Sequence, residues 1–298
     1  NLSQMNAVRH RQKARFMRLI RSINVHPCVS VDKFLRLLFN KPVKFIVLGS
    51  GSSVPHPKRT GSAYWLETES GSILLDFAPS AIHRMAQEGL DWANLDAVWI
   101  SHFHLDHCGG LAPFLFGTKY APETQNRKKP LKIVGPKGLK KLLDAFNKAN
   151  DYRLFQQPFP LEITEVEPYE NFEILNGIRA VAISTFHTEE SCAIRITDNE
   201  DRAIVFSSDT GFSKDLSAFA KNADLFVLEC SFVKDKPVEK HLELAEAMFL
   251  VRRAKPKRAM LTHFYAEWDD VDFEKEIELL AQKIKILKAV DGLRIDLS

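Results

Sequence analysis

The sequence predicts an α/β domain in which two sheets pack face to face and helices cover their outer faces. Strand patterns followed by a helix pattern occur twice along the chain, an order typical of such a layered sandwich. The 298 residues are 45% hydrophobic and 27% charged, an ordinary balance for a globular chain that buries a sizeable core. We find no internal repeat or low-complexity segment in the sequence between residues 43 and 298.

The expected elements follow from hydrophobic period and turn residues. In the first half, strands are predicted at 43–49, 62–68, 71–77, 95–102 and 131–136, and helices at 80–89 and 137–150. In the second half, strands are predicted at 161–168, 178–187, 191–198, 202–209, 224–232 and 258–264, and helices at 215–223, 241–254 and 269–290. We therefore expect one domain over 43–298.

Residues 1–40 form a separate, basic helical extension in this prediction. The stretch MNAVRHRQKARFMRLIRSI carries six arginine or lysine residues among apolar residues at near-helical spacing, and SVDKFLRLLFN predicts a second, short helix. Packing on the same domain or a neighbouring subunit, contact with RNA, and a membrane-surface or targeting role all stay open. Apolar side chains on one face also favour self-association, so we expect a homodimer or higher homo-oligomer.

Composition excludes several classes of protein. The sequence has no run of about eighteen apolar residues and no signal-peptide core, so we expect a cytoplasmic protein with no membrane partner. The four cysteines (Cys28, Cys108, Cys192 and Cys230) form no CxxC pair, so we expect reduced thiols and no cysteine zinc site. The net charge of +3 is too small to indicate a polyanionic partner by itself.

The stretch ISHFHLDHCGG, at 100–110, combines four side chains that can bind metal. In an extended segment, His102 and His104 project to the same side and can meet one ion, and Asp106 and His107 follow after a turn. Four such polar side chains in six residues are costly to desolvate without an ion. The stretch therefore predicts a metal site.

Further ligand-type residues stand where apolar strands end. These are His187 in VAISTFHTE, Asp209 in IVFSSDTG and His263 in AMLTHF. A rigid sheet projects such residues into a common cleft. Each residue alone could be structural, but together with the cluster at 102–107 they indicate a metal centre.

These motifs resemble those of a known superfamily. SHFHLDH is similar to the HxHxDH signature of the metallo-β-lactamase-fold hydrolases, and IVLGSGSSVPHPKRTGSAYWLE, ILLDF, SSDTG and LTHF resemble its ribonuclease Z-like branch. The similarity covers about residues 43–275. It implies a four-layer αββα sandwich with two zinc ions at one edge of the two sheets.

The resemblance also implies a role for each ligand. His102, His104 and His187 would bind the first ion, Asp106, His107 and His263 the second, and Asp209 both, with a hydroxide between the ions as nucleophile. Asp106 would also orient the nucleophilic water. Asp76, which ends ILLDF, is a candidate for orienting a ligand imidazole, with a turn-forming role as the alternative.

Two further residues match positions of the ribonuclease Z-like branch. His241 would assist proton transfer to the leaving oxygen, and Glu229 matches an acidic position; an ordinary structural role is the alternative for each. The remaining histidines of the sequence lack partners in the motifs, and we expect ordinary roles for His10, His26, His56 and His83.

The bridging carboxylate favours phosphodiester cleavage, because the resemblance makes such a bridge typical of phosphodiesterases and nucleases. The leading hypothesis is a ribonuclease Z-like endonuclease that acts on RNA 3′ ends of transfer RNA precursors. Candidate phosphate contacts are basic residues, which in most proteins are merely solvated: 126–130, Lys132, Lys137, Lys140, Lys141 and 252–258.

Two departures from the branch weaken transfer RNA specificity. The step from His187 to Asp209 is only 22 residues, enough for a hairpin, whereas the long arm that grips transfer RNA is usually inserted there. LLDFAPS also replaces the usual LxDCGEGT. Hydrolysis of a β-lactam antibiotic, as the main or a second activity, and of a small phosphodiester or lactone therefore stay open. A metal-stabilised binding module is the non-enzymatic alternative.

Overall fold

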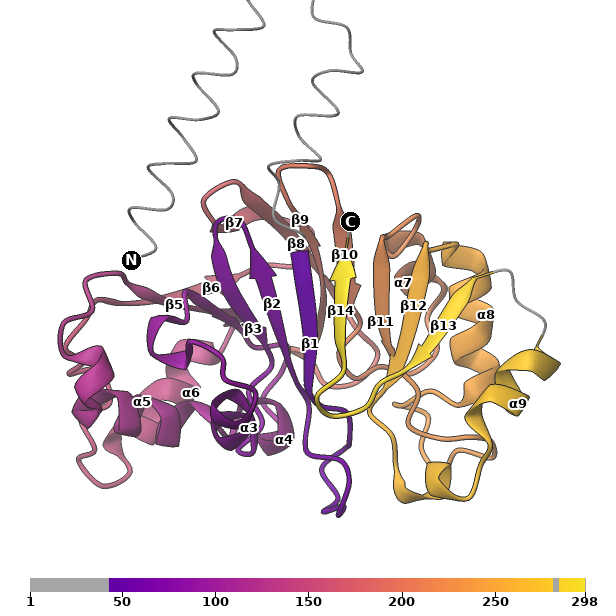
Figure 1. The fold of residues 1–298 in the computed structure, drawn as a ribbon, viewed down its shortest axis with the longest axis horizontal. Coiled ribbons are helices and arrows are strands. Elements are labelled where there is room, and N and C mark those ends of the chain that lie inside the picture. The colour runs from indigo at the N-terminus through magenta and orange to yellow at the C-terminus, as the bar shows by residue number, and fades with distance from the viewer. Residues whose placement is uncertain (1–42, 281–283, 298) are drawn as a thin grey trace, which may run out of the picture. The chain divides into compact units, whose positions relative to one another are not determined.

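The structure is a computed structural model that describes residues 43–280 and 284–297. Two mixed sheets of seven strands each pack against one another, and helices lie on their outer sides (Figure 1). The predicted four-layer αββα sandwich is confirmed. The predicted extension over 1–40 lies outside the described residues.

The first sheet has the strand order β14-β1-β2-β3-β4-β5-β6. Neighbouring strands run antiparallel from β14 to β3 and parallel from β3 to β6. Its strands are β1 (Val43–Gly49), β2 (Ala63–Thr68), β3 (Gly71–Leu75), β4 (Ala97–Trp99), β5 (Leu131–Pro136), β6 (Leu161–Val166) and β14 (Arg294–Leu297).

The second sheet has the order β13-β12-β11-β10-β9-β8-β7. Neighbouring strands run antiparallel from β7 to β10 and parallel from β10 to β13. Its strands are β7 (Asn171–Leu175), β8 (Ile178–Ser184), β9 (Cys192–Thr197), β10 (Ala203–Phe206), β11 (Leu225–Glu229), β12 (Arg258–Thr262) and β13 (Lys285–Lys288). Because β10, β11 and β12 are parallel, their carboxyl ends meet at one edge.

Strand alternation places apolar side chains on both faces of the first sheet. Phe45 and Val47 of β1 belong to the core between the sheets, whereas Ile46 and Leu48 belong to the core beneath the helices. The helices over this sheet are α3 (Ala81–Gln87), α5 (Leu111–Tyr120) and α6 (Leu139–Lys148), and the single turn α4 (Leu105–Cys108) lies at the sheet edge.

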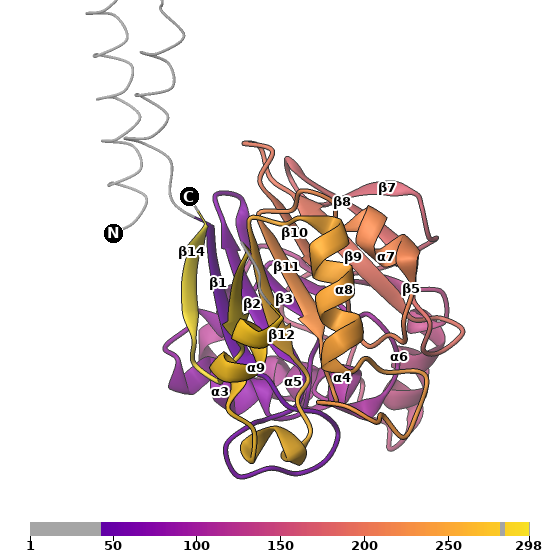
Figure 2. The same ribbon diagram turned by 90° about the vertical axis from the view of Figure 1, so that its right-hand side faces the viewer.

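The second sheet has its own helices, α7 (Lys214–Phe219), α8 (Leu244–Ala254) and α9 (Phe273–Leu279). The helix α8 lies over β11 (Figure 2) and begins with a capping box in which Glu243 and Glu246 satisfy each other's backbone N–H groups. Short 3₁₀ turns cover Trp92–Asn94, Pro122–Thr124 and Ala266–Asp269. None of the described helices is long and apolar enough to cross a membrane.

The two sheets are also joined by polar contacts near the edge where the metal-ligand candidates lie. The Tyr64 hydroxyl on β2 lies 2.7 Å from Thr262 Oγ1 on β12, and Phe264 N–H donates to the Ser50 carbonyl at 3.0 Å. Both contacts flank His263, which follows β12. These two hydrogen bonds fix the distance between the sheets at the edge where both sheets contribute residues to the candidate site.

The predicted helix over 269–290 is wrong in its second half. The helix α9 ends at Leu279, and Lys285–Lys288 is the strand β13, paired in parallel with β12 through Met260 and Leu287. Pairing with a neighbouring strand overrides the helical pattern of the sequence. The sequence patterns also failed to predict β7, β14 and α5, whose apolar faces are evident only against the packed sheets.

Candidate metal centre

The first sheet delivers four of the candidate ligands through one short connection. The strand β4 ends at Trp99, and the chain continues extended through His102 to His104, the residue that precedes α4. The single turn of α4 then presents Asp106 and His107. His102 and His107 are fully buried, whereas His104 is exposed.

The second sheet delivers the other three from separate strands. His187 follows β8, Asp209 follows β10 and His263 follows β12. All three side chains are buried. As expected from the sequence, strands that are far apart in the chain bring them to the same edge as the first four.

The Asp209 carboxylate lies at the centre of the cluster. Its Oδ2 atom lies 3.9 Å from His102 Nε2, 3.7 Å from His187 Nε2 and 3.3 Å from His107 Nε2, and its Oδ1 atom lies 3.2 Å from His263 Nε2. One carboxylate therefore faces imidazoles from both predicted ligand sets.

The remaining contacts divide the cluster into two groups. In the first, His187 Nε2 lies 3.1 Å from His104 Nδ1. In the second, Asp106 Oδ2 lies 3.4 Å from His107 Nε2 and 3.6 Å from His263 Nε2. The ligand atoms of His102, His104, His187 and Asp209 lie within 4.8 Å of one another, as do those of Asp106, His107 and His263.

Three buried nitrogen atoms in this cluster have no hydrogen-bond partner among the described residues: Nε2 of His102, His107 and His263. Leaving a buried polar atom unsatisfied costs about 1–3 kcal/mol each. Metal coordination would satisfy all three, and imidazole with carboxylate ligands suits zinc. The residues therefore fit the metal that the sequence motifs imply.

The other nitrogen of each buried ligand imidazole is held by a neighbouring group. His107 Nδ1 lies 2.6 Å from Asp76 Oδ2, and His102 Nδ1 lies 3.0 Å from Ser101 Oγ, which itself donates to Asp76. These bonds direct Nε2 into the cluster. Asp76, the candidate for this role, makes the contact with His107 that the role requires. Ser101 was not among the candidates, because an isolated serine carries no motif.

On the second sheet, the orienting groups are uncharged. His187 Nδ1 donates to the Lys240 carbonyl at 3.0 Å, and His263 Nδ1 lies 3.0 Å from Ser231 Oγ. His263 has a φ of 62°, a left-handed conformation that costs energy in a non-glycine residue and recurs at functional sites. No sequence motif marks either orienting group, because both depend on loops that only the fold brings together.

Glu229 and His241 form a buried pair beside the cluster. His241 Nδ1 lies 2.9 Å from Glu229 Oε1, and the rings of His241 and His263 are stacked with centroids 5.4 Å apart. Glu229, at the end of β11, also accepts from the N–H of Thr210 at 2.7 Å and from the N–H of Leu242 at 3.1 Å. The Glu229 carboxylate thus positions both His241 and Thr210, the residue that follows Asp209.

Charges in the cluster shift its protonation equilibria. Burial alone would lower the pKa of His107, yet the carboxylates of Asp209 and Asp76 raise it well above its usual range. Burial, followed by the charge on His107, lowers the pKa of His102 well below its usual range. Burial opposes the charge on Asp209, but His107 and His263 hold its pKa well below the ordinary value. Asp209 is therefore ionised at neutral pH.

A cleft of about 720 Å³ opens beside His104 and Asp106. Its wall includes Arg59 and His56, which are tied to Asp269: Arg59 Nη1 lies 2.5 Å and His56 Nε2 lies 2.8 Å from that carboxylate. Arg59 is the one arginine or lysine among the described residues that line the cleft. The expectation that His56 lacks partners was wrong, because Asp269 is distant in sequence.

The basic residues considered as phosphate contacts do not gather at this cleft. Arg127 is buried and donates to the carbonyls of Ala93 and Leu95, so it is structural. Lys257 pairs with Asp224 at 2.5 Å. Lys137 and Lys141 line a different cavity.

The sandwich and the histidine and aspartate cluster at its edge define a metallo-β-lactamase-fold hydrolase. The chain belongs to the family described as anti-Pycsar protein Apyc1, whose profile matches residues 43–286. Among curated proteins it is similar to ribonuclease Z of Ignicoccus hospitalis, 26% identical over 78% of this chain and 91% of that protein. Ribonuclease Z of Nitrosopumilus maritimus is 24% identical over 86% of this chain and 100% of that protein.

Solved structures share the fold. The metallo-β-lactamase-fold protein YhfI from Bacillus subtilis superposes with a TM-score of 0.71 at 21% identity, over 86% of this chain and 100% of that chain. The short form of human tRNase Z gives 0.69 at 19% identity, over 86% and 99%. These neighbours confirm the predicted fold, and the curated relatives named ribonuclease Z confirm the predicted resemblance to that branch.

Proposed function

We propose that the chain is a dinuclear zinc-dependent phosphodiester hydrolase. The observation that carries this proposal is the position of the Asp209 carboxylate, 3.2–3.9 Å from the Nε2 atoms of four histidines that belong to two ligand groups. A carboxylate placed in this way can bind two ions at once. The first ion would be held by His102, His104 and His187, and the second by Asp106, His107 and His263.

Two such ions would lower the pKa of a water molecule between them and stabilise negative charge on the attacked phosphate. Asp106 and Asp209 carry the negative charge that holds the ions, and both are ionised, since nearby histidines keep their pKa values below the ordinary range although burial opposes this. His102, His107 and Asp209 are themselves buried, which limits their solvation and strengthens these interactions.

His241 is the proposed general acid. Burial lowers its pKa, but the hydrogen bond and charge of Glu229 outweigh burial and raise it above the ordinary value. With Nδ1 held by Glu229, the proton on Nε2 is free for transfer to the leaving oxygen, and the hydrogen bond to Glu229 keeps the imidazole in place for that transfer. This pair supplies the proton that expulsion of an alkoxide requires.

The substrates we propose are small phosphodiesters. The cleft beside Asp106 offers hydroxyl groups and apolar side chains, and its arginine is already paired with Asp269. Binding an RNA backbone takes several unpaired lysine or arginine residues. The 22-residue step from His187 to Asp209 is a β9–β10 hairpin, with room for no transfer RNA-gripping arm.

Cleavage of RNA 3′ ends is the second candidate, because curated relatives that align over most of this chain are named ribonuclease Z. The bridging position of Asp209 favours either phosphodiester reaction over β-lactam hydrolysis.

One assay separates these activities. Zinc-loaded protein is incubated with bis(p-nitrophenyl) phosphate, a 3′-extended transfer RNA precursor and a chromogenic cephalosporin. We expect turnover of the small phosphodiester and no turnover of the cephalosporin. If the RNA 3′ end is cleaved at a comparable rate, RNA and not a small phosphodiester is the substrate. Turnover of the cephalosporin alone would overturn the proposal.

A further inference from the structure

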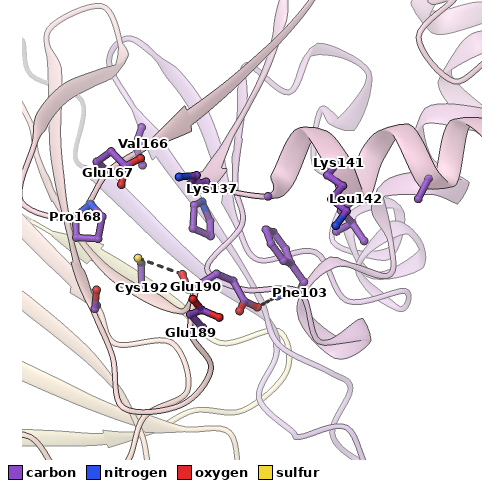
Figure 3. A pocket seen from close by; sticks show the side chains of 14 residues that line it. Phe103, Lys137, Lys141, Leu142, Val166, Glu167, Pro168, Glu189, Glu190 and Cys192 are labelled. Carbon is purple, nitrogen blue, oxygen red and sulfur yellow. Dashed lines mark hydrogen bonds between the residues drawn. The ribbon is translucent and has the colours of Figure 1, made fainter.

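A second cavity, of about 630 Å³, is lined in part by Phe103, the residue between His102 and His104 (Figure 3). Its volume is within the range of small-molecule sites, about 300–1,000 Å³. None of the seven metal-ligand candidates lines it. Its floor is apolar and comes from both sheets and from α6: Phe103, Pro136, Leu142, Ala145, Val166 and Cys192.

The rim of this cavity carries unpaired charges of both signs. Lys137, just before α6, and Lys141, in its first turn, lie in the upper part of Figure 3 with Glu167 to their left, and Glu189 lies below them beside Glu190. Among the described residues, Lys137, Lys141 and Glu189 form no ion pair or side-chain hydrogen bond. Glu165 already caps the start of α6 by accepting from the N–H groups of Gly138 and Lys140, so the backbone there is satisfied.

The cavity wall is directly connected to the metal-ligand loop. Glu190 Oε1 accepts from the Phe103 N–H at 3.3 Å, and the Cys192 N–H donates to the Ser101 carbonyl at 3.0 Å. The backbone on both sides of His102 is therefore bonded to the segment that forms the cavity. A molecule that packs on the Phe103 ring and binds Glu190 would therefore shift the backbone on either side of His102.

We propose that this cavity is an effector site for a small apolar zwitterion, of which a dipeptide with free ends is the simplest example. Its carboxylate lies against Lys137 and Lys141, its ammonium group against Glu189 and Glu190, and its side chains over Phe103. Occupancy changes the position of the loop between His102 and His104 and, with it, the affinity of the site for metal. This inference does not depend on which bond the metal centre hydrolyses.

Calorimetric titration of the zinc-loaded full chain tests the ligand class. The probes are leucyl-phenylalanine, its N-acetyl form, which lacks the cation, and its amide, which lacks the anion. We expect the zwitterion to bind at least about tenfold more tightly than either analogue, which corresponds to about 1.4 kcal/mol. Equal binding of all three, or no binding of the zwitterion at about 10 mM, would overturn the proposal.

Matched variants test the location. Lys141→Met removes a rim cation and should weaken binding of leucyl-phenylalanine, whereas Lys140→Met changes a neighbouring exposed lysine that does not line the cavity and should leave binding intact. Ala145→Phe fills the cavity and should abolish binding. Ala149→Phe, at the C-cap of the same helix and outside the cavity lining, is the control. Full binding in Ala145→Phe would place the ligand elsewhere.

The effector role has its own readout. The Kd for zinc is measured by competition with a chromogenic chelator, with and without saturating leucyl-phenylalanine. We expect a change of about fivefold or more, and by linkage the same factor in the dipeptide Kd when zinc is removed. An unchanged zinc Kd would remove the effector role. Because no turnover is measured, a failure of the proposed hydrolase activity cannot produce this result.

Discussion

The two sheets contribute to the metal centre in different ways. The first sheet supplies four candidate ligands from six consecutive residues, between His102 and His107, whereas the second supplies His187, Asp209 and His263 from three separate strand ends. The first half is a local motif whose ligands are close in any fold. The second half exists only when β8, β10 and β12 are assembled, so it couples metal binding to the packing of the whole sandwich.

The two halves also differ in how their imidazoles are held. The carboxylate of Asp76 anchors His107 at 2.6 Å and accepts from Ser101, which contacts His102. On the second sheet, a serine hydroxyl holds the imidazole of His263 and a backbone carbonyl holds that of His187. The first half therefore has an ionic anchor, and the second half has uncharged ones.

The largest effect is expected at the residue that joins the halves. Asp209→Asn keeps the size of the side chain and removes its charge, so phosphodiesterase activity should fall by more than about 10³-fold, because several kcal/mol of charge stabilisation is lost with the ions. Initial rates with bis(p-nitrophenyl) phosphate measure this loss. Asp215→Asn, at an exposed position in α7, is the matched control. If Asp209→Asn keeps activity within tenfold of the parent, Asp209 is not a metal ligand.

Loss of the proposed acid has the next largest effect. His241→Ala should lower kcat by about 10²-fold or more, the usual contribution of a general acid. In Glu229→Gln the pKa of His241 falls, because the carboxylate that raises it is gone. A general acid must be protonated, so the alkaline limb of the pH–rate profile should move to lower pH. A profile that stays in place would make Glu229 only a structural partner.

The anchors of the two halves should differ in strength. Asp76→Asn is expected to weaken zinc binding by about 10–100-fold, the usual cost of losing an orienting partner. Ser231→Ala removes an uncharged partner of His263 and should cost less. Chelator competition measures both, and circular dichroism confirms folding. A larger loss in Ser231→Ala would reverse the comparison between the halves.

The smallest effect is the pH dependence of zinc binding. Without metal, His107 holds a proton between Asp76 and Asp209, since those carboxylates raise its pKa despite burial. Zinc must displace this proton, so the zinc Kd should decrease as the pH rises from about 6 to about 9. Removing Asp76 lowers the pKa of His107 and should flatten the dependence in the upper part of this range. A zinc Kd independent of pH would contradict the assignment of His107.

The sequence was sufficient for the sandwich and for the seven candidate ligands, because apolar strands, the spacing of His102, His104 and His107, and ligand-type residues at strand ends are local signals. It was insufficient where a residue acts through a distant partner. Ser231 and the Lys240 carbonyl carry no motif, and Asp269 reaches His56 across 213 residues. The residues of strand β13 have a helical sequence pattern, and their pairing with β12 is also non-local.

Metal stoichiometry tests the account most directly. A crystal of the zinc-loaded protein, measured at the zinc absorption edge, should show two anomalous peaks, one among His102, His104 and His187 and one among Asp106, His107 and His263, with the Asp209 carboxylate bound to both. A single peak that Asp209 contacts from one side, in crystals with excess zinc, would contradict a dinuclear centre joined by that residue.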